Sequence, residues 1–296
     1  MEPIKRLIII LLMALTSFGC FPSTNSEVRG TPQQSTYIQN TGSDTIVNLA
    51  LAWAEKYQSI NPDVRISVSG GGSGTGIAAL INKTVDIANA SRKIKPEEKQ
   101  AAEKNGVEPQ EFTIARDAIA VIVNPHNPVN QLTLQQISDI FSGKINRWNE
   151  LGGEDRPIVR LSRETNSGTH VYFLETVLRL GQKDNKTMFS TDTLLLPSSQ
   201  GIVDELTQNP NAIGYDGLGY VTPELKVIAV AKDANSPYVT PSIETVNNGS
   251  YPISRDLYMY TVGTPTGAIA KYIQWIMSPE AQQIVSDLGF VPIVIK

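Results

Sequence analysis

The sequence predicts an α/β protein, and three observations support this class. Strand-like and helix-like segments alternate between residues 37 and 296, which is typical of layered α/β domains. Apolar residues make up 41% of the 296 residues, enough for a sizeable buried core. Only 18% of the residues are charged, which argues against a coiled coil or a disordered acidic chain. The length favours two lobes, while length alone also permits one large domain.

Short apolar or alternating runs predict the strands. Residues 64–68 alternate apolar and polar side chains, as expected for a strand with one buried face. Residues 118–123 form an almost unbroken apolar run, which is typical of a central strand. The runs 158–161, 227–230 and 257–262 resemble strands in the same way.

Helices are predicted between these strands. Residues 46–57 place apolar side chains at spacings near three and four, which indicates an amphipathic helix. Residues 96–105 are rich in charge, with Pro96 in the first turn and Gly106 just beyond the end, so we expect a solvated helix.

The N-terminus resembles a secretory signal. Lys5 and Arg6 precede nine apolar residues, 7–15, too few to cross a bilayer of ~30 Å as a helix. The run leads to a sequence ending in Cys20, the one cysteine of the chain, which resembles a lipoprotein cleavage site. We expect a signal peptide over 1–19 and a lipid-anchored flexible tether over 20–35. An ordinary signal peptide with a chance cysteine is the alternative.

Composition excludes several kinds of site. Lys and Arg number 25 against 29 Asp and Glu, a net charge of −4, so no basic surface for nucleic acid is indicated. Two histidines and one cysteine are too few for a structural zinc site, an iron–sulfur cluster or a disulfide framework. We therefore expect no metal and no cofactor.

Short loops rich in Ser, Thr and Gly precede four predicted helices. They are residues 41–45, 70–76, 166–169 and 198–201. A helix start has up to four N–H groups without an internal partner and carries roughly half a positive charge. Small side chains let an anion approach these groups, and hydroxyls add donors. Several such starts aimed at one point would hold a small oxyanion.

Helix capping is the simpler explanation of each loop taken alone, because Ser, Thr, Asp and Gly are preferred wherever a helix begins. The stretch 70–76 has more glycine than capping requires. It is not a nucleotide-binding P-loop, since Ile77 stands where that motif has lysine.

Arg163 is a candidate partner for an oxyanion. It lies four residues before Ser167, at the end of a predicted strand. A guanidinium there can form charge-assisted hydrogen bonds in forked geometry. The neighbouring Glu164 can pair with it. A surface arginine in a loop is the alternative.

A series of motifs follows in a fixed order: GSDT, GGGSGTGI with VDIANASR, ARDAIAVIVNP, LTLQQISDIFSGKINRW, SRETNSGTHVYF and AIGY. In this order they resemble the phosphate ABC-transporter substrate-binding protein family. The resemblance covers residues 37–296, and residues 132–148 and 163–173 are its most specific stretches.

The resemblance implies a type II periplasmic-binding-protein fold. In this fold two α/β lobes are joined by two crossing segments, and the ligand cleft lies between them. We expect the crossings near residues 116–118 and 254–256. Lobe 1 would then be 36–117 with 255–296, and lobe 2 would be 118–254. Helices over 265–277 and 279–288 would pack on lobe 1.

The resemblance also implies a set of phosphate ligands from both lobes. They are Ser43, Asp44 and Thr45 in the first loop, Ser73 in the second, Ser91 with Arg92 after a strand at 85–89, and Arg163, Ser167, Gly168 and Thr169 from the opposite lobe. Closure of the lobes would hold phosphate between them and make the ligand state visible to a partner.

One position departs from the family pattern. Some members carry an aspartate where this chain has Ser91, and that carboxylate accepts a hydrogen bond from hydrogen phosphate. Sulfate has no proton to donate, so it would leave the acceptor unpaired at a cost of ~1–3 kcal/mol or more. We hypothesise that Asp44 supplies the acceptor here. The alternative is that Asp44 only caps the helix at Ile46.

These observations predict a non-enzymatic, extracytoplasmic lipoprotein that captures inorganic phosphate and delivers it to an ABC permease. We expect a monomer in the periplasm or at the cell surface, attached to the membrane through lipid alone. A receptor for sulfate, molybdate or arsenate is one alternative. A secreted phosphate-ester hydrolase using Ser167 or Ser73 is another, although His170 near Ser167 has no evident third partner.

Overall fold

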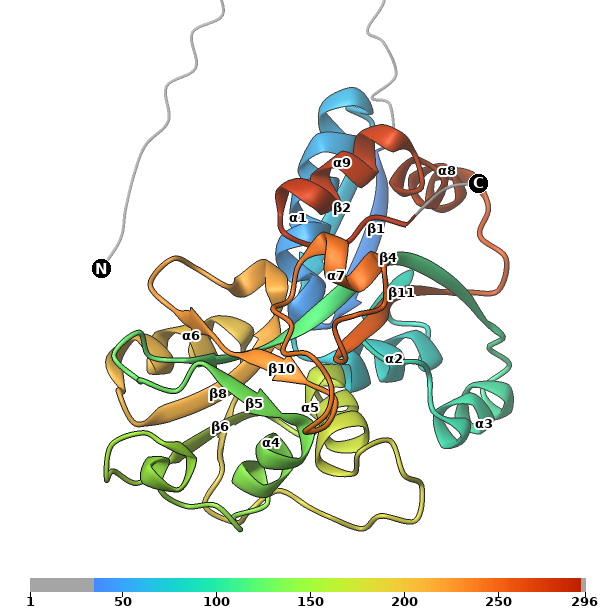
Figure 1. Ribbon diagram of the computed structural model, residues 1–296. Helices are drawn as coiled ribbons and strands as arrows, with labels where there is room; N and C mark the ends of the chain where they lie inside the picture. Colours follow the sequence, from blue (N-terminus) through green and yellow to red (C-terminus); the bar gives the residue numbers. More distant parts are fainter. Residues whose placement is uncertain (1–34, 294–296) are drawn as a thin grey trace, which may run out of the picture. The chain divides into compact units, whose positions relative to one another are not determined.

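A mixed sheet organises the fold and confirms the predicted α/β class (Figure 1). The computed structural model describes residues 35–293. In the main sheet the strands pair in the order β2-β1-β3-β11-β4-β8-β6-β7, with β9 also on β4, and β10 pairs with β5 separately. The strands are β1 (Thr36–Gly42), β2 (Val64–Ser69), β3 (Ile87–Ala90), β4 (Pro109–Val123), β5 (Gln131–Thr133), β6 (Val159–Arg163), β7 (Leu194–Leu196), β8 (Ala212–Gly217), β9 (Lys226–Val227), β10 (Ala229–Ala231) and β11 (Ser254–Val262).

Helices cover the sheet and connect its strands. They are α1 (Asp44–Ile60), α2 (Ser73–Ile81), α3 (Pro96–Lys104), α4 (Leu134–Phe141), α5 (Gly168–Phe173), α6 (Ser199–Gln208), α7 (Ile243–Asn247), α8 (Gly267–Ile276) and α9 (Pro279–Asp287). Short 3₁₀ turns lie at Trp148–Leu151 and Leu218–Tyr220. The predicted helices at 46–57 and 96–105 are confirmed as α1 and α3.

Two predicted elements are irregular in the structure. The run 227–230 is not one strand, because β9 pairs with β4 while β10 pairs with β5, and the chain changes partner at Ile228. The helix after the 166–169 loop is α5 for six residues and then continues as a π-helical turn, Leu174–Leu178. Apolar spacing alone does not distinguish these cases.

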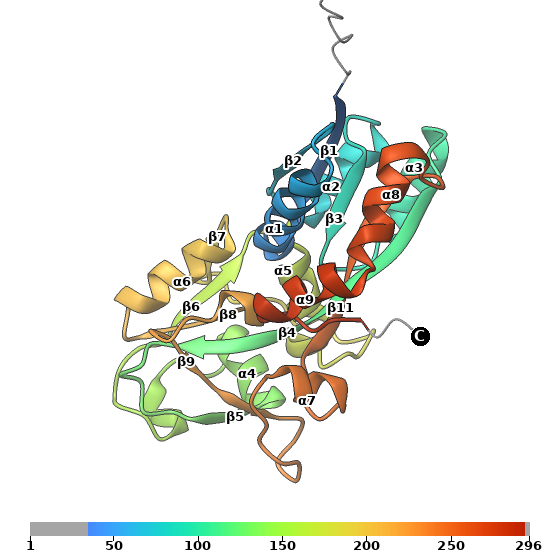
Figure 2. The ribbon, with the colours of Figure 1, turned by 90° about the horizontal axis from the view of Figure 1, so that it is seen from above.

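The buried apolar side chains form two core regions. The first core region draws on residues 38–115 and 257–290, under α1, α2, α8 and α9. The second core region draws on residues 118–253 together with Val291. The chain passes between the regions along β4 and β11, and Figure 2 shows β4 as one long strand that reaches β9.

The segments predicted to cross between lobes lie opposite one another. In the antiparallel register of β4 and β11, Ser254 faces Ala118 and Asp256 faces Arg116. The helices predicted at 265–277 and 279–288 are α8 and α9. They pack on α1, where the Trp53 indole donates to the Ala281 carbonyl at 2.8 Å.

The predicted signal peptide, Cys20 and nearly all of the predicted tether lie outside the described residues. Within residues 35–293, no helix is both long enough and apolar enough to cross a membrane.

Candidate functional site

Three of the serines predicted as ligands meet in one buried place. Ser43 precedes α1, Ser73 begins α2, and Ser91 follows β3. Ser43 Oγ donates to Ser91 Oγ at 2.9 Å, and Ser73 Oγ lies 3.2 Å from Ser91 Oγ. Ser73 Oγ also accepts from the Ser91 N–H at 3.0 Å. Together with Gly168, these residues are called the serine cluster below.

Gly168 brings the second core region against these serines. It is the first residue of α5, and a Cβ atom added to it would collide with Ser73 Oγ and Ser91 Oγ. A larger residue would therefore push α5 away from the serines. The backbone adds a link nearby, where Gly74 N–H donates to the Asn166 carbonyl at 3.0 Å.

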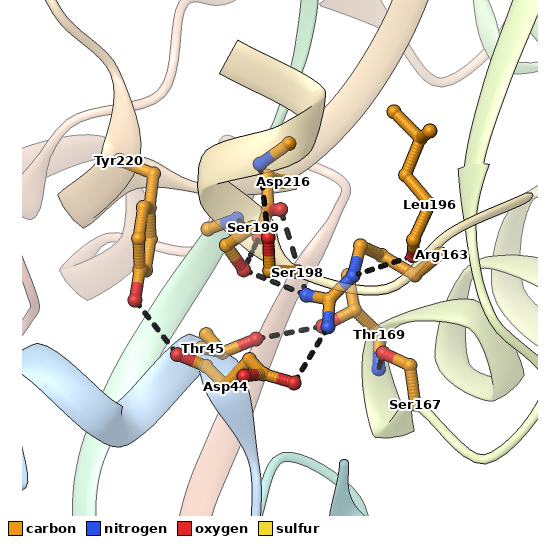
Figure 3. A network of polar contacts seen from close by, with 12 residues as sticks. Asp44, Thr45, Arg163, Ser167, Thr169, Leu196, Ser198, Ser199, Asp216 and Tyr220 are labelled. Atoms are coloured by element: carbon orange, nitrogen blue, oxygen red, sulfur yellow. Dashed lines mark hydrogen bonds and ion pairs between the residues drawn. The ribbon is translucent and has the colours of Figure 1, made fainter. Parts of the chain in front are cut away.

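Arg163 is the centre of a second group of buried and partly buried polar residues (Figure 3). Its Nη2 donates to Asp44 Oδ2 at 2.8 Å, and its Nη1 donates to Ser199 Oγ at 2.7 Å. Ser199 Oγ in turn donates to Asp216 Oδ1 at 3.0 Å. Asp44, Arg163, Ser199 and Asp216 are called the arginine cluster below. Asp44 comes from α1 in the first core region, so the cluster joins both regions.

The guanidinium of Arg163 is held from several sides. The carbonyls of Leu196 and Pro197 also accept from it, and its side chain is only 1% exposed. The surface-arginine interpretation is therefore wrong. Glu164 is exposed, and the carboxyls that pair with Arg163 are those of Asp44 and Asp216.

Asp216 is a fully buried carboxyl beside this cation. Its Oδ2 lies 3.8 Å from Arg163 Nη1 and has no hydrogen-bond partner among the described residues. Burial raises the pKa of Asp216 from its ordinary value, although Arg163 opposes the shift. The arginine cluster thus contains a carboxyl that binds a proton more readily than an exposed aspartate.

A pair of threonines lies between the two clusters. Thr45 Oγ1 and Thr169 Oγ1 are 2.8 Å apart and both are buried. Arg255 Nη2 donates to Thr169 Oγ1 at 2.9 Å, and Arg255 is itself paired with Asp117. Like Asp44 and Arg163, these threonines are predicted ligands that join the first and second core regions directly.

Helix capping explains two of the four loops. Ser167 Oγ accepts from the Thr169 N–H at 3.2 Å, and Ser198 Oγ accepts from the Gly201 N–H at 3.0 Å. Ser43 makes no such bond to α1, and α2 follows Gly72, which has no capping side chain. The hydroxyls of Ser43 and Ser73 are instead used within the serine cluster.

The glycines at 70–76 have local structural reasons. Gly71 and Gly72 have φ angles of +112° and +92°, which favour residues without a Cβ. A Cβ added to Gly70 would collide with Asp44 Oδ1. Some of these glycines are therefore explained by the backbone conformation, and Gly70 by the space that the Asp44 side chain needs.

Arg92 is the predicted ligand that the structure directs elsewhere. Its Nη1 and Nη2 donate to the two carboxylate oxygens of Glu98, at 2.8 and 2.6 Å. The pair is mostly buried, with 8% and 20% side-chain exposure. Its guanidinium is thus joined to α3 rather than to the serine or arginine cluster.

Sequence reasoning missed several residues of this site. Ser199 appeared only within a loop, Arg255 and Asp117 only as crossing positions, and Asp216 not at all. One signal in the sequence could have indicated them: charged residues that interrupt apolar, strand-like segments, as in ARDAIAV, GYDG and SRDLYMY. Buried charges are rare unless they are paired, so each of these positions required a partner.

No catalytic or metal constellation stands out in the part of the chain that the structure describes. Among residues 35–293, no group of His, Cys, Asp and Glu side chains could hold a metal ion. His170 Nδ1 lies 3.0 Å from Ser162 Oγ, and burial lowers the pKa of His170. This histidine therefore pairs with a residue of β6 outside the two clusters.

The chain is similar in sequence to a known family model and to known binding proteins. Residues 27–280 match the family model of the PBP superfamily domain. The chain is 34% identical to the Phosphate-binding protein PstS of Pseudomonas aeruginosa, over 88% of this chain and 84% of that protein. The PstS of Bacillus subtilis is 30% identical, over 98% and 94%.

A solved structure resembles the fold closely. A putative phosphate ABC transporter substrate-binding protein with bound phosphate, from Clostridium perfringens, aligns with a TM-score of 0.78 and 35% identity. The alignment covers 88% of this chain and all of that chain. The predicted two-lobe periplasmic-binding-protein fold is thereby confirmed. The chain belongs to the phosphate ABC-transporter substrate-binding proteins of the PBP superfamily, which are transport receptors and not enzymes.

Proposed function

We propose that this chain is an extracytoplasmic receptor that binds inorganic phosphate between two lobes and delivers it to an ABC permease. One observation carries the proposal. The serine cluster, the threonine pair Thr45 and Thr169, and Arg163 are buried close to one another although they come from separate parts of the chain. Neutral hydroxyl donors and one guanidinium suit a small tetrahedral anion. The names of the relatives support phosphate as that anion.

The proposed lobes are 36–117 with 255–296, and 118–254. The division of the apolar core at β4 and β11 supports this boundary, since the first core region lies on one side of it and nearly all of the second on the other. In this arrangement Ser43, Ser73 and Ser91 come from lobe 1, and Arg163 and Gly168 come from lobe 2. Binding of phosphate between them would favour the closed form, which a permease can recognise.

The proposed ligands divide by chemistry. The hydroxyls of Ser43, Ser73, Ser91, Ser167 and Thr169 donate hydrogen bonds, and Arg163 supplies positive charge. Thr45 and Gly168 place the two lobes close together. Arg92 contributes charge from the edge of the site, because Glu98 holds its terminal nitrogens.

Asp44 is the proposed acceptor for the proton of hydrogen phosphate. Its carboxylate faces Arg163 rather than capping α1, and its side chain is 14% exposed. Gly70 leaves room for it, since any Cβ there would collide with Oδ1. Hydrogen phosphate can donate to this carboxylate, whereas sulfate would place an oxygen acceptor against it.

A competition experiment tests the ligand. Purified native protein is titrated with radiolabelled phosphate alone and with excess sulfate, molybdate or arsenate. We expect saturable phosphate binding that excess sulfate and molybdate leave unchanged. Displacement by sulfate or molybdate at equal concentration would assign the protein to another oxyanion, and absence of phosphate binding would overturn the proposal.

The selectivity hypothesis is tested by Asp44→Asn. An amide can donate to sulfate, so we expect phosphate affinity to fall by roughly tenfold and the preference over sulfate to shrink. Glu164→Gln is the matched control, because it removes a neighbouring exposed charge without touching Arg163. An unchanged preference in Asp44→Asn would assign Asp44 a role in orienting Arg163 alone.

We propose that Cys20 carries a lipid that anchors the receptor outside the cytoplasmic membrane, and that the body is a monomer. The signal-like segment 1–19 and the position of Cys20 support the anchor. Mass spectrometry of the mature protein and of Cys20→Ser would detect the lipid. Light scattering of the body would measure its oligomeric state.

A further inference from the structure

Arg255 lies where β4 and β11 carry the chain between the two core regions. In the antiparallel register it is directly opposite Asp117. Its Nη2 donates to Asp117 Oδ2 at 3.0 Å, and both side chains are buried. Residues directly opposite one another are the closest neighbours across a strand pair. This ion pair therefore connects the two crossing segments themselves.

The Arg255 guanidinium also reaches three of the predicted ligands. Nη1 donates to the Ser91 carbonyl at 3.0 Å, and Nη2 donates to Thr169 Oγ1 at 2.9 Å. Nη2 lies within 3.4 Å of Thr45 Oγ1 as well. Ser91 and Thr45 belong to the first core region and Thr169 to the second. One rigid, planar group thus fixes groups from both sides at once, which a lysine ammonium cannot do with the same geometry.

Asp117 holds this guanidinium in place. Its Oδ1 accepts from the Leu218 N–H at 3.1 Å, and a Cβ added to Gly217 would lie 2.9 Å from its Oδ2. The Tyr172 ring packs beside the Arg255 guanidinium at 5.5 Å. A buried cation is costly unless it is paired and hydrogen-bonded. The contacts with Asp117 and Tyr172 therefore favour one orientation of the Arg255 side chain.

We propose that Arg255, oriented by Asp117, is a positioning residue that aligns Thr45, Thr169 and the Ser91 carbonyl across the two lobes for phosphate binding. The inference rests on the proposed function. Arg255 acts through these partners, because its terminal nitrogens are occupied by protein acceptors. We therefore expect Arg255 to affect the dissociation rate of phosphate more than its association rate. Differences in affinity between related complexes fall mainly in the dissociation rate.

The test compares Arg255→Lys with Arg160→Lys. Arg160 is also a buried arginine, and its partners, Asp192, Asn146 and two carbonyls, all belong to the second core region. Both substitutions keep the positive charge and lose the guanidinium fork. Phosphate association and release are measured by stopped flow, and thermal unfolding reports stability.

We expect Arg255→Lys to release phosphate roughly ten- to a hundredfold faster, with a nearly unchanged association rate. Arg160→Lys should lose stability and keep the native release rate. Should Arg255→Lys fail to fold, the double variant Arg255→Gln with Asp117→Asn removes both buried charges together and allows the same comparison.

Two negative results are distinguishable. Native protein that does not bind phosphate would overturn the proposed function and this inference with it. Native protein that binds phosphate, combined with native release from folded Arg255→Lys, would overturn the inference alone. Equal acceleration in Arg160→Lys would also overturn it, because a general loss of stability would then explain the effect.

Discussion

The serine cluster and the arginine cluster contrast in how they are built. The serine cluster consists of neutral hydroxyls that bond to one another, with Gly168 in contact with them. The arginine cluster has one cation, Arg163, in contact with two carboxyls, Asp44 and Asp216. The first depends on close fit and the second on charge. Under the proposed function, a substitution that alters packing in the serine cluster should therefore affect phosphate binding differently from one that alters charge in the arginine cluster.

Loss of the cation should have the largest effect. Arg163→Gln removes the proposed charged donor and leaves the buried Asp216 without its counter-ion. We expect phosphate affinity to fall on the order of a hundredfold and the protein to lose about 3–5 kcal/mol of stability. Isothermal titration at fixed salt and thermal unfolding measure the two losses separately.

Arg92→Gln is the control for that variant. It removes an equal charge near the site, but its guanidinium pairs with Glu98. We expect a much smaller loss of affinity. Equal losses in the two variants would show that general positive charge, rather than the geometry of the arginine cluster, determines binding.

Closeness of fit is tested by Gly168→Ala. The added methyl group would meet Ser73 Oγ and Ser91 Oγ, so the serines and α5 must separate. We expect phosphate affinity to fall by about tenfold and the protein to lose about 1–3 kcal/mol of stability. Gly201→Ala is a matched control in the first turn of α6, where the methyl group lies 3.3 Å from Ser198 Oγ. Native affinity in Gly168→Ala would show that the serine cluster tolerates separation.

The contrast between the clusters also shows what the sequence can predict. Motif order predicted the serines and Arg163 as ligands, because each motif is a local run of residues whose types are set by a loop and a helix start. The partners of Arg163 were not predictable in this way, since Ser199 and Asp216 approach it only through the pairing of β6 with β8 and the position of α6.

The capping role of Ser198 and the place of Ser43 in the serine cluster were likewise not separable from the sequence. Ser198 and Ser43 both precede helices, and only the contacts of each hydroxyl distinguish them. The direction of the Arg92 guanidinium toward Glu98 depends on where α3 packs. The strands, by contrast, could be predicted from the sequence, because burial of one or both faces directly determines the pattern of apolar and polar residues.

The titration of the arginine cluster distinguishes it from the neutral serine cluster. Because burial raises the pKa of Asp216, the folded protein binds a proton here more readily than the unfolded chain does. Its contribution to stability is therefore present at low pH and is lost as the pH rises through the raised pKa. Asp216→Asn does not titrate, so its melting temperature relative to that of the native protein should increase as the pH is raised.

Asp117 acts in the same direction in this experiment. Burial raises its pKa to about 6, and the nearby Asp216 charge contributes to that shift. Removing Asp216 therefore also weakens the pH dependence due to Asp117. A constant difference in melting temperature across the pH range would contradict the raised pKa of Asp216.

The smallest effects are expected for two serine substitutions, one at a helix cap and one in the serine cluster. Ser198→Ala removes the acceptor of the Gly201 N–H, so we expect a loss of about 1 kcal/mol of stability with native phosphate affinity. Ser43→Ala removes no cap and instead removes a donor to Ser91 Oγ, so we expect a several-fold loss of affinity with little change in stability. Thermal unfolding and phosphate titration of both variants test this opposite pattern. If Ser43→Ala lost stability and kept its affinity, Ser43 would be a structural residue, and the serine cluster would lose its proposed role at the start of α1.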